Sequence, residues 1–119
     1  MTARSRNLTD ALRFREGVAL YAMLSGLDSA RARPMRRRIS DALGDGILPD
    51  VDGIPNVWIE TSSRISYRFG EDLDQARRLA DDGGRKYAAL VQHRSGRPLG
   101  DSFVVMSLED WSALAVSKI

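Results

Sequence analysis

Residues 47–62, ILPDVDGIPNVWIETS, restrict the fold more than any other stretch, because they hold two short apolar runs joined by a Gly-Ile-Pro-Asn segment. Glycine, proline and asparagine in this arrangement are typical of a tight turn. The stretch therefore predicts a hairpin of two strands. In the second strand, a period of two places Trp58, Glu60 and Ser62 on one face of the sheet and the residues between them on the other.

Acidic residues follow the same hairpin. Asp50 and Asp52 lie near the end of the first run, and Glu60 lies inside the second. A carboxylate flanked by apolar residues on a buried strand costs free energy unless a positive charge pairs with it. Acids brought together by such a hairpin would bind a hard divalent cation, which takes oxygen ligands. The alternative is that Asp50 and Asp52 are only turn residues and that Glu60 is exposed on an edge strand.

The composition fits one domain over residues 1–119, with 43% hydrophobic and 29% charged residues. The absence of cysteine excludes a disulfide framework, a thiolate nucleophile and a cysteine-ligated zinc. A single histidine, His93, excludes a multi-histidine metal site within one chain. No apolar run approaches the roughly 20 residues that span a bilayer, and we find no secretory signal. We expect no membrane association and a cytoplasmic location.

The charge is unevenly distributed along the chain. Residues 1–40 hold nine arginines and three acids, a net charge of +6, whereas residues 41–119 have a net charge of −4. A basic face beside an acidic cluster is what a metal-dependent phosphodiesterase acting on nucleic acid needs. An ordinary solvated surface is the alternative. The arginines expected to contact phosphates without reading sequence are Arg31, Arg33, Arg36, Arg37 and Arg38.

A first helix is predicted from a cap at Asn7 or Thr9 to Leu24, with Gly26 as its stop. Its i,i+4 row reads Leu8, Leu12, Glu16, Leu20, Leu24. An acid in the middle of an apolar row predicts that Glu16 faces the core or a cleft. The alternative is a surface residue paired with a neighbouring arginine.

The remaining elements alternate between strands and helices. We predict strands over residues 35–40, 87–92 and 102–106, a helix over 71–82, and a last helix that Ser107 caps and that turns Trp111 inward. With the hairpin, the order is α-β-β-β-α-β-β-α. This order predicts an α/β or α+β domain with a mixed sheet flanked by helices.

Together these features resemble the PD-(D/E)XK nuclease fold, which has a restriction-endonuclease-like sheet. The nearest likeness is to small phage and archaeal Holliday junction resolvase-like endonucleases. The likeness rests on the basic lead Arg4–Asn7, the helix with Glu16, and the segment Pro49–Glu60, and it extends to Gln75 and to residues 87–101. It covers nearly the whole chain.

The resemblance implies a structure-selective endonuclease that cuts phosphodiester bonds in branched DNA such as a four-way junction. Asp50 and Glu60 would be the metal-holding carboxylates, with the Thr61 carbonyl as a further ligand and Glu16 as the helix acid near the site. Asp52 is an alternative ligand. Mg²⁺ (or Mn²⁺) would polarise the scissile phosphate and activate the attacking water. A homodimer would match the two-fold symmetry of the junction.

One position departs from the motif, because Ser62 stands where the family has lysine. One alternative is that Arg64, which is also expected to contact DNA, substitutes for this cation, and a second is that Lys86 reaches in from a neighbouring strand. The third alternative is a catalytically inactive nuclease-fold protein that binds DNA or a protein partner. A small protein-interaction domain without a nucleic-acid role is a further possibility.

Overall fold

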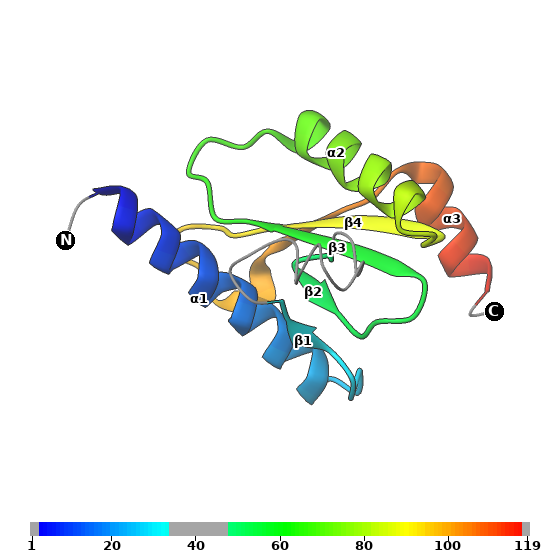
Figure 1. Ribbon diagram of the computed structural model, residues 1–119, viewed down its shortest axis with the longest axis horizontal. Coiled ribbons are helices and arrows are strands. Elements are labelled where there is room, and N and C mark those ends of the chain that lie inside the picture. Colours follow the sequence, from blue (N-terminus) through cyan, green and yellow to red (C-terminus); the bar gives the residue numbers. More distant parts are fainter. Residues whose placement is uncertain (1–2, 34–47, 118–119) are drawn as a thin grey trace, which may run out of the picture.

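The computed structural model of the chain describes residues 3–33 and 48–117, and the side chains of 9–33 and 48–117. Along these residues three α-helices and a five-stranded sheet follow one another (Figure 1). Their bounds are α1 Ala3–Leu24, β1 Arg31–Ala32, β2 Val51–Asp52, β3 Val57–Ser62, α2 Phe69–Asp82, β4 Tyr87–Gln92, the 3-10 turn η2 Leu99–Asp101, β5 Phe103–Val105 and α3 Leu108–Val116. The predicted order α-β-β-β-α-β-β-α is confirmed.

The sheet has the strand order β1-β2-β3-β4-β5. The predicted hairpin is present, since β2 and β3 pair antiparallel with Val51 opposite Ile59. After β3 the chain crosses over through α2, and β4 then pairs parallel to β3, from Val57 opposite Tyr87 to Ser62 opposite Gln92. The other neighbouring strands are antiparallel. The sheet is therefore mixed, as predicted.

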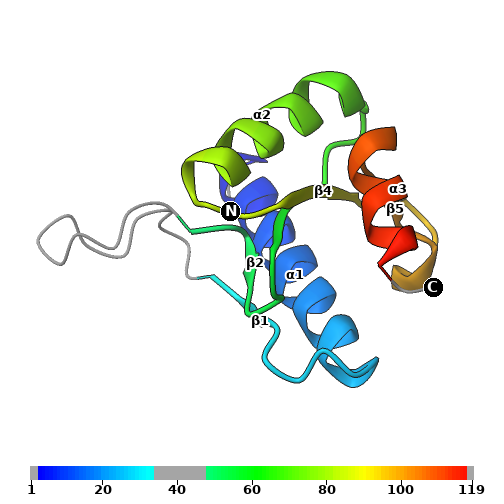
Figure 2. The ribbon, with the colours of Figure 1, turned by 90° about the vertical axis from the view of Figure 1, so that its right-hand side faces the viewer.

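Helices α1 and α2 lie on opposite faces of the sheet (Figures 1 and 2). Alternation along β3 and β4 supplies each face with its apolar side chains. On the α1 face the buried cluster includes Phe14, Ala19, Ile59, Ala89 and Val91. On the α2 face it consists of Trp58, Ala76, Ala80 and Ala88. Burial on both faces explains why β4 reads as a continuous apolar run.

The hairpin turn depends on a glycine. Gly53 has a φ of +86°, and a Cβ built on it would lie 1.8 Å from the carbonyl oxygen of Ser29. Only glycine allows both this backbone conformation and this approach. The turn is thereby packed against the segment that precedes β1, which brings β1 and β2 together.

The predicted inner face of the first helix is wrong. Leu20 and Leu24, which belong to the expected apolar row, are exposed, Leu24 to 75%. Glu16 is exposed as well. The face packed on the sheet instead carries Phe14, Val18, Ala19 and Ala22. The helix also begins before the expected caps, since α1 starts at Ala3.

The last helix, α3, is capped as predicted, with the Asp110 N–H donating to Ser107 Oγ over 3.0 Å. Its expected inward packing is wrong for Trp111, which is 58% exposed. None of the residues of α3 is buried. The helix follows the edge strand β5, and its N-terminal residues Glu109 and Asp110 contact Arg77 of α2 and the Ala88 N–H of β4.

The strand predicted over residues 35–40, and with it Arg36, Arg37 and Arg38, lies outside the described residues. Within the two described ranges, no helix has both the length and the apolar character needed to cross a membrane.

Candidate functional site

Asp50 and Glu60 line the same cavity, which has a volume of about 330 Å³. Asp50 directly precedes β2 and Glu60 lies in β3, and each is one residue from the paired Val51 and Ile59. The hairpin therefore sets the two acids next to each other across the strands. The rest of the lining comes from α1 and α2, from the residue after β1, from the end of β3 with the residues that follow it, and from β4: Ala11, Arg15, Arg33, Thr61, Ser62, Ser63, Arg64, Asp72, Gln75 and Leu90.

The carboxylate of Asp50 is held on both of its oxygens. Its Oδ2 accepts hydrogen bonds from the Thr61 N–H over 2.8 Å and from Thr61 Oγ1 over 3.0 Å. Its Oδ1 pairs with Arg33 Nη2 and lies 3.5 Å from Arg15 Nη2. Asp50 is only 3% exposed. The favourable partners that a buried charge requires are therefore supplied by three different segments.

The two arginines are themselves part of this arrangement. Arg15 Nη1 donates to the Arg33 carbonyl over 3.2 Å, and the Arg33 N–H donates to the Asp50 carbonyl over 2.9 Å. Burial raises the pKa of Asp50, but the Thr61 N–H and the charges of Arg15 and Arg33 outweigh it, so that the net pKa lies below its ordinary value. Asp50 is thus ionised at neutral pH.

Glu60 is also buried, and Trp58 fixes its orientation. Glu60 Oε1 accepts a hydrogen bond from Trp58 Nε1 over 2.8 Å. The Trp58 ring is packed among Ala76, Ala80 and Ala88 beneath α2. Because Trp58 and Glu60 share a face of β3, the core under α2 positions the Glu60 carboxylate at the cavity.

Asp52 does not line this cavity. It pairs with Arg85 over 2.9 Å and with Arg31 over 3.2 Å. Burial raises the pKa of Asp52, but hydrogen bonds from Arg85 and Gly53 and the charges of Arg85 and Arg31 give a net lowering. The structure therefore places Asp52 in a separate ion-pair cluster. The prediction that Asp52 is an alternative metal ligand beside Asp50 is wrong.

Of the two cations considered as substitutes for the motif lysine, only Arg64 lines the cavity. Its N–H donates to Ser62 Oγ over 3.3 Å, and its carbonyl accepts from Gln92 Nε2 over 2.9 Å. The backbone of Arg64 is thus tied to the ends of β3 and β4. Its side chain is exposed, which leaves the guanidinium accessible to a phosphate.

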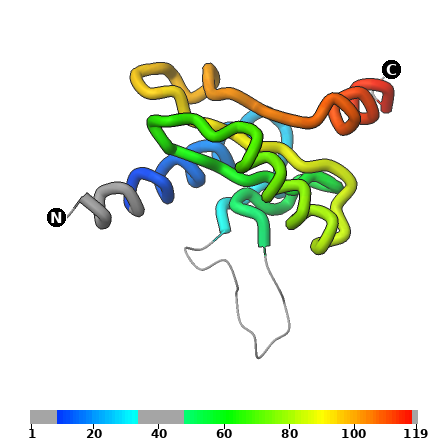
Figure 3. Tube along the Cα trace, turned by 90° about the horizontal axis from the view of Figure 1, so that it is seen from above, coloured from blue at the N-terminus to red at the C-terminus, as the bar shows by residue number. Residues whose placement is uncertain are grey.

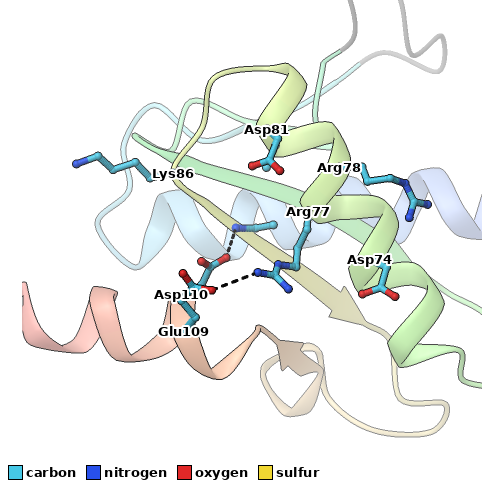
Figure 4. A pocket seen from close by; sticks show the side chains of 9 residues that line it. Asp74, Arg77, Arg78, Asp81, Lys86, Glu109 and Asp110 are labelled. Atoms are coloured by element: carbon cyan, nitrogen blue, oxygen red, sulfur yellow. Dashed lines mark hydrogen bonds and ion pairs between the residues drawn. The ribbon is translucent and has the colours of Figure 1, made fainter.

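Lys86 lies elsewhere, and its predicted role at this site is wrong. It lines a second cavity of about 430 Å³ between α2 and α3, where Arg77 pairs with Glu109 and Asp110 accepts from the Ala88 N–H (Figure 4). Lys86 precedes the first residue of β4, which is opposite Val57, whereas Ser62 is opposite the last. The parallel pairing thus puts Lys86 and Ser62 at opposite ends of the sheet.

Other predicted residues are only partly brought together. Glu16 is exposed and does not line the cavity, whereas its neighbour Arg15 does. Arg33 is buried against Asp50 and is therefore not a surface contact for phosphate. Arg31 is 67% exposed at its side chain and pairs with Asp52.

Sequence reasoning missed the role of Arg15. A usable signal was its spacing of four from Ala11, because both side chains then share one helical face, and both line the cavity. It also missed Asp72, a lining residue whose Oδ2 is buried without a hydrogen-bond partner.

The carboxylate oxygens of this cavity suit Mg²⁺ or Mn²⁺, which take hard oxygen ligands. Mg²⁺ is usually bound through one or two protein carboxylates plus substrate phosphates. Two carboxylates, Asp50 and Glu60, therefore fit, and the buried unpartnered oxygen of Asp72 adds to the acidic character. Within residues 9–33 and 48–117 no group of three or more His, Cys, Asp or Glu residues is arranged to hold a metal. An ion at Asp50 would share its carboxylate with Arg15 and Arg33.

Comparisons of the chain with protein-family models, with curated proteins and with solved structures gave no match.

Proposed function

We propose that the chain is a Mg²⁺-dependent (or Mn²⁺-dependent) structure-selective endonuclease that cuts phosphodiester bonds in branched DNA, in the manner of a Holliday junction resolvase. The observation that supports this proposal is the shared cavity of Asp50 and Glu60, with the exposed Arg64 among its lining residues. The same hairpin carries the sequence features that resemble the PD-(D/E)XK nucleases.

In this proposal Asp50, Glu60 and the carbonyl of Thr61 hold the metal ion. When bound, the ion supplies Lewis-acid polarisation of the scissile phosphate and lowers the pKa of a coordinated water. The Thr61 N–H and hydroxyl orient Asp50, and Trp58 orients Glu60. The protein's contribution is thus preorganisation, because both carboxylates are fixed before substrate arrives.

Arg64 supplies the positive charge that the motif lysine would give. Its guanidinium donates in a planar fork that suits phosphate oxygens. Ser62 cannot provide this charge, and its hydroxyl accepts from the Arg64 N–H instead. Loss of one charged transition-state contact lowers a rate by roughly 100- to 1000-fold, so Arg64→Gln should reduce cleavage by that factor.

The test is cleavage of a labelled four-way junction and of a linear duplex of matched sequence, in Mg²⁺ and in Mn²⁺. We expect cuts near the branch, and at least about 100-fold slower cleavage by Asp50→Asn and by Glu60→Gln. Asp81→Asn is the matched control, since this exposed acid lines the second cavity (Figure 4). Junction binding without cleavage in either metal would exclude the enzyme.

A second candidate is a catalytically inactive nuclease-fold protein that binds DNA or a protein. It is favoured by Ser62 and by the occupation of both Asp50 oxygens by Arg15, Arg33 and Thr61. Ser62→Lys separates the two candidates. If this variant cleaves a junction that the natural sequence leaves intact, the natural protein is the inactive form.

The proposed enzyme acts as a homodimer, because a four-way junction has two-fold symmetry and two strands to cut. Exposed apolar side chains on β5 and α3 support an association surface there: Val104, Leu108, Trp111 and Val116. Sedimentation equilibrium measures the mass directly. Leu108→Glu should shift a dimer toward monomer, and a monomeric natural chain would contradict the proposal.

A further inference from the structure

The loop that joins β3 to α2, residues 63–68, presents an apolar side chain to solvent. Ile65 is 88% exposed, the highest value among the large apolar side chains of the described residues. The loop lies at one end of the molecule, together with the first half of α1 and the segment after β4 (Figures 1 and 3). Burying Ile65 would release free energy, so its exposure is a cost that a ligand can recover.

Ile65 lines two hollows. One has a volume of about 520 Å³ and the other of about 440 Å³, and Ile65, Arg64 and Asp10 line both. Each hollow also has an arginine of its own, Arg13 in the first and Arg68 in the second. Together the two hollows are lined by three arginines and one carboxylate, and Arg68 also pairs with Glu71 of α2. The remaining excess of positive charge favours an anionic backbone beside the apolar side chain.

The loop is fixed on both sides of Ile65. Before it, the Arg64 carbonyl accepts from Gln92, a side chain with 0% exposure. After it, the Tyr67 ring stacks on Phe69 with centroids 5.1 Å apart and meets the edge of Phe103 at 5.7 Å. An apolar side chain on such a supported loop keeps its position when a ligand presses against it.

We propose that Ile65 is a wedge that enters branched DNA at the branch point, with the phosphates of one arm in each of the two hollows. Apolar side chains inserted between base steps unstack them, and the unstacking costs least where stacking is already interrupted. Arg64 and Ser63 also line the cavity of Asp50 and Glu60, so a wedged branch would lie next to the carboxylates. This inference rests on the proposed function and specifies how it selects its substrate.

The test uses the full-length chain, a four-way junction with 2-aminopurine beside the branch, and a linear duplex of matched sequence, in Ca²⁺. Unstacking of 2-aminopurine raises its fluorescence. We expect a rise with the natural chain and with Ile65→Leu, and its loss with Ile65→Ser. Ile65→Ser should bind the junction roughly 10- to 100-fold more weakly, and the duplex with less than about a twofold change.

Leu24→Ser is the matched control, because Leu24 is 75% exposed at the other end of α1. It should leave junction binding and fluorescence unchanged. An unchanged Ile65→Ser, or an equal loss with Leu24→Ser, overturns the wedge, whether or not the protein cleaves. A fluorescence rise that depends on Ile65 in a protein that cuts in neither Mg²⁺ nor Mn²⁺ supports the wedge and overturns only the enzyme.

Discussion

At the scale of single residues, the buried pair of Asp50 and Arg33 dominates the energetics of the site. Both side chains are buried, and the free-energy cost of burying each charge is offset by the opposite charge of its partner. The same carboxylate also binds the backbone of β3 through Thr61. Asp50 therefore joins α1, the end of β1 and the hairpin, and in the proposed enzyme it is also a metal ligand. Stability and activity depend here on one side chain.

We predict that Asp50→Asn lowers the free energy of unfolding by about 3–5 kcal/mol, because it leaves the Arg33 guanidinium buried against a neutral amide. Urea denaturation at pH 7 measures the change. Asp81→Asn, at an exposed position, is the control and should change it by less than about 0.5 kcal/mol. Equal stability of the natural chain and Asp50→Asn would show that the pair contributes nothing net.

The lowered pKa of Asp50 also predicts a dependence on pH. A carboxyl whose folded-state pKa is lowered stabilises the protein above its unfolded-state pKa, about 3.9. That stabilisation is lost as the pH falls through the folded-state pKa. The stability difference between the natural chain and Asp50→Asn should therefore be constant from pH 7 to about pH 5 and shrink at lower pH.

Urea midpoints measured at unit steps from pH 6 to pH 3 check this dependence. Ile59→Val is the control, since it removes a buried methylene without removing a titrating group and should cost about 0.5–1.5 kcal/mol at every pH. A difference for Asp50→Asn that stays flat to pH 3 would mean that Asp50 has the same pKa in the folded and unfolded chains.

At the scale of elements, the hairpin depends on its turn. We predict that Gly53→Ala destabilises the protein more than Gly26→Ala. Both glycines have a positive φ, which costs an L-residue about 1–2 kcal/mol. Only at Gly53 would the new Cβ meet backbone, the Ser29 carbonyl, whereas nothing lies within 4 Å at Gly26. The clash should add about 1–3 kcal/mol.

Chemical denaturation compares the two glycine variants. Because Gly53 brings β1 and β2 together and Asp50 directly precedes β2, the cleavage rate of Gly53→Ala should fall as well, while that of Gly26→Ala should not. If the two variants were equally stable, the turn at Gly53 would have room for a Cβ, and the Ser29 carbonyl would not restrict this position.

Elements with a strong local signal were predictable. The strand Tyr87–Gln92 has the predicted bounds, because a continuous apolar run fits burial on both sides of a sheet. The faces of the helices were less predictable. On α1, Leu20 and Leu24 of the predicted apolar row are exposed, and Arg15 turns inward because its partner Asp50 lies across the fold. On α3, which follows the edge strand β5, no residue is buried, and Trp111 is exposed.

At the scale of the whole molecule, the two acids of the candidate site were predictable because one hairpin carries both. Their neighbours were not. Arg33 and Arg15 lie 17 and 35 positions before Asp50, and a single sequence gives no periodic signal for a pairing over such distances. Whether Arg64 or Lys86 lies at the site was also not predictable from the sequence. It depends on the parallel pairing of β3 and β4, which places the two residues at opposite ends of the sheet.

The candidate site and the cavity lined by Lys86 lie at opposite ends of the sheet. This arrangement predicts which arginines contribute to the salt dependence of DNA affinity. Each phosphate contact contributes about one to the slope of log affinity against log salt. Arg13 is exposed in the hollow beside Ile65, whereas Arg78 is exposed in the cavity at the other end of the sheet (Figure 4). Arg13→Gln should therefore lower the slope for a four-way junction by about one, and Arg78→Gln should not change it.

Fluorescence anisotropy between 50 and 200 mM salt, about the range over which phosphate contacts are strongly weakened, measures both slopes. Equal slopes for the two variants would place the DNA elsewhere on the surface. Negligible affinity of the natural chain even at the lowest salt would instead favour a protein-interaction domain without a nucleic-acid role. In that case the arginines around Asp50 would serve only to neutralise a buried acid, and the cavity would have no catalytic role.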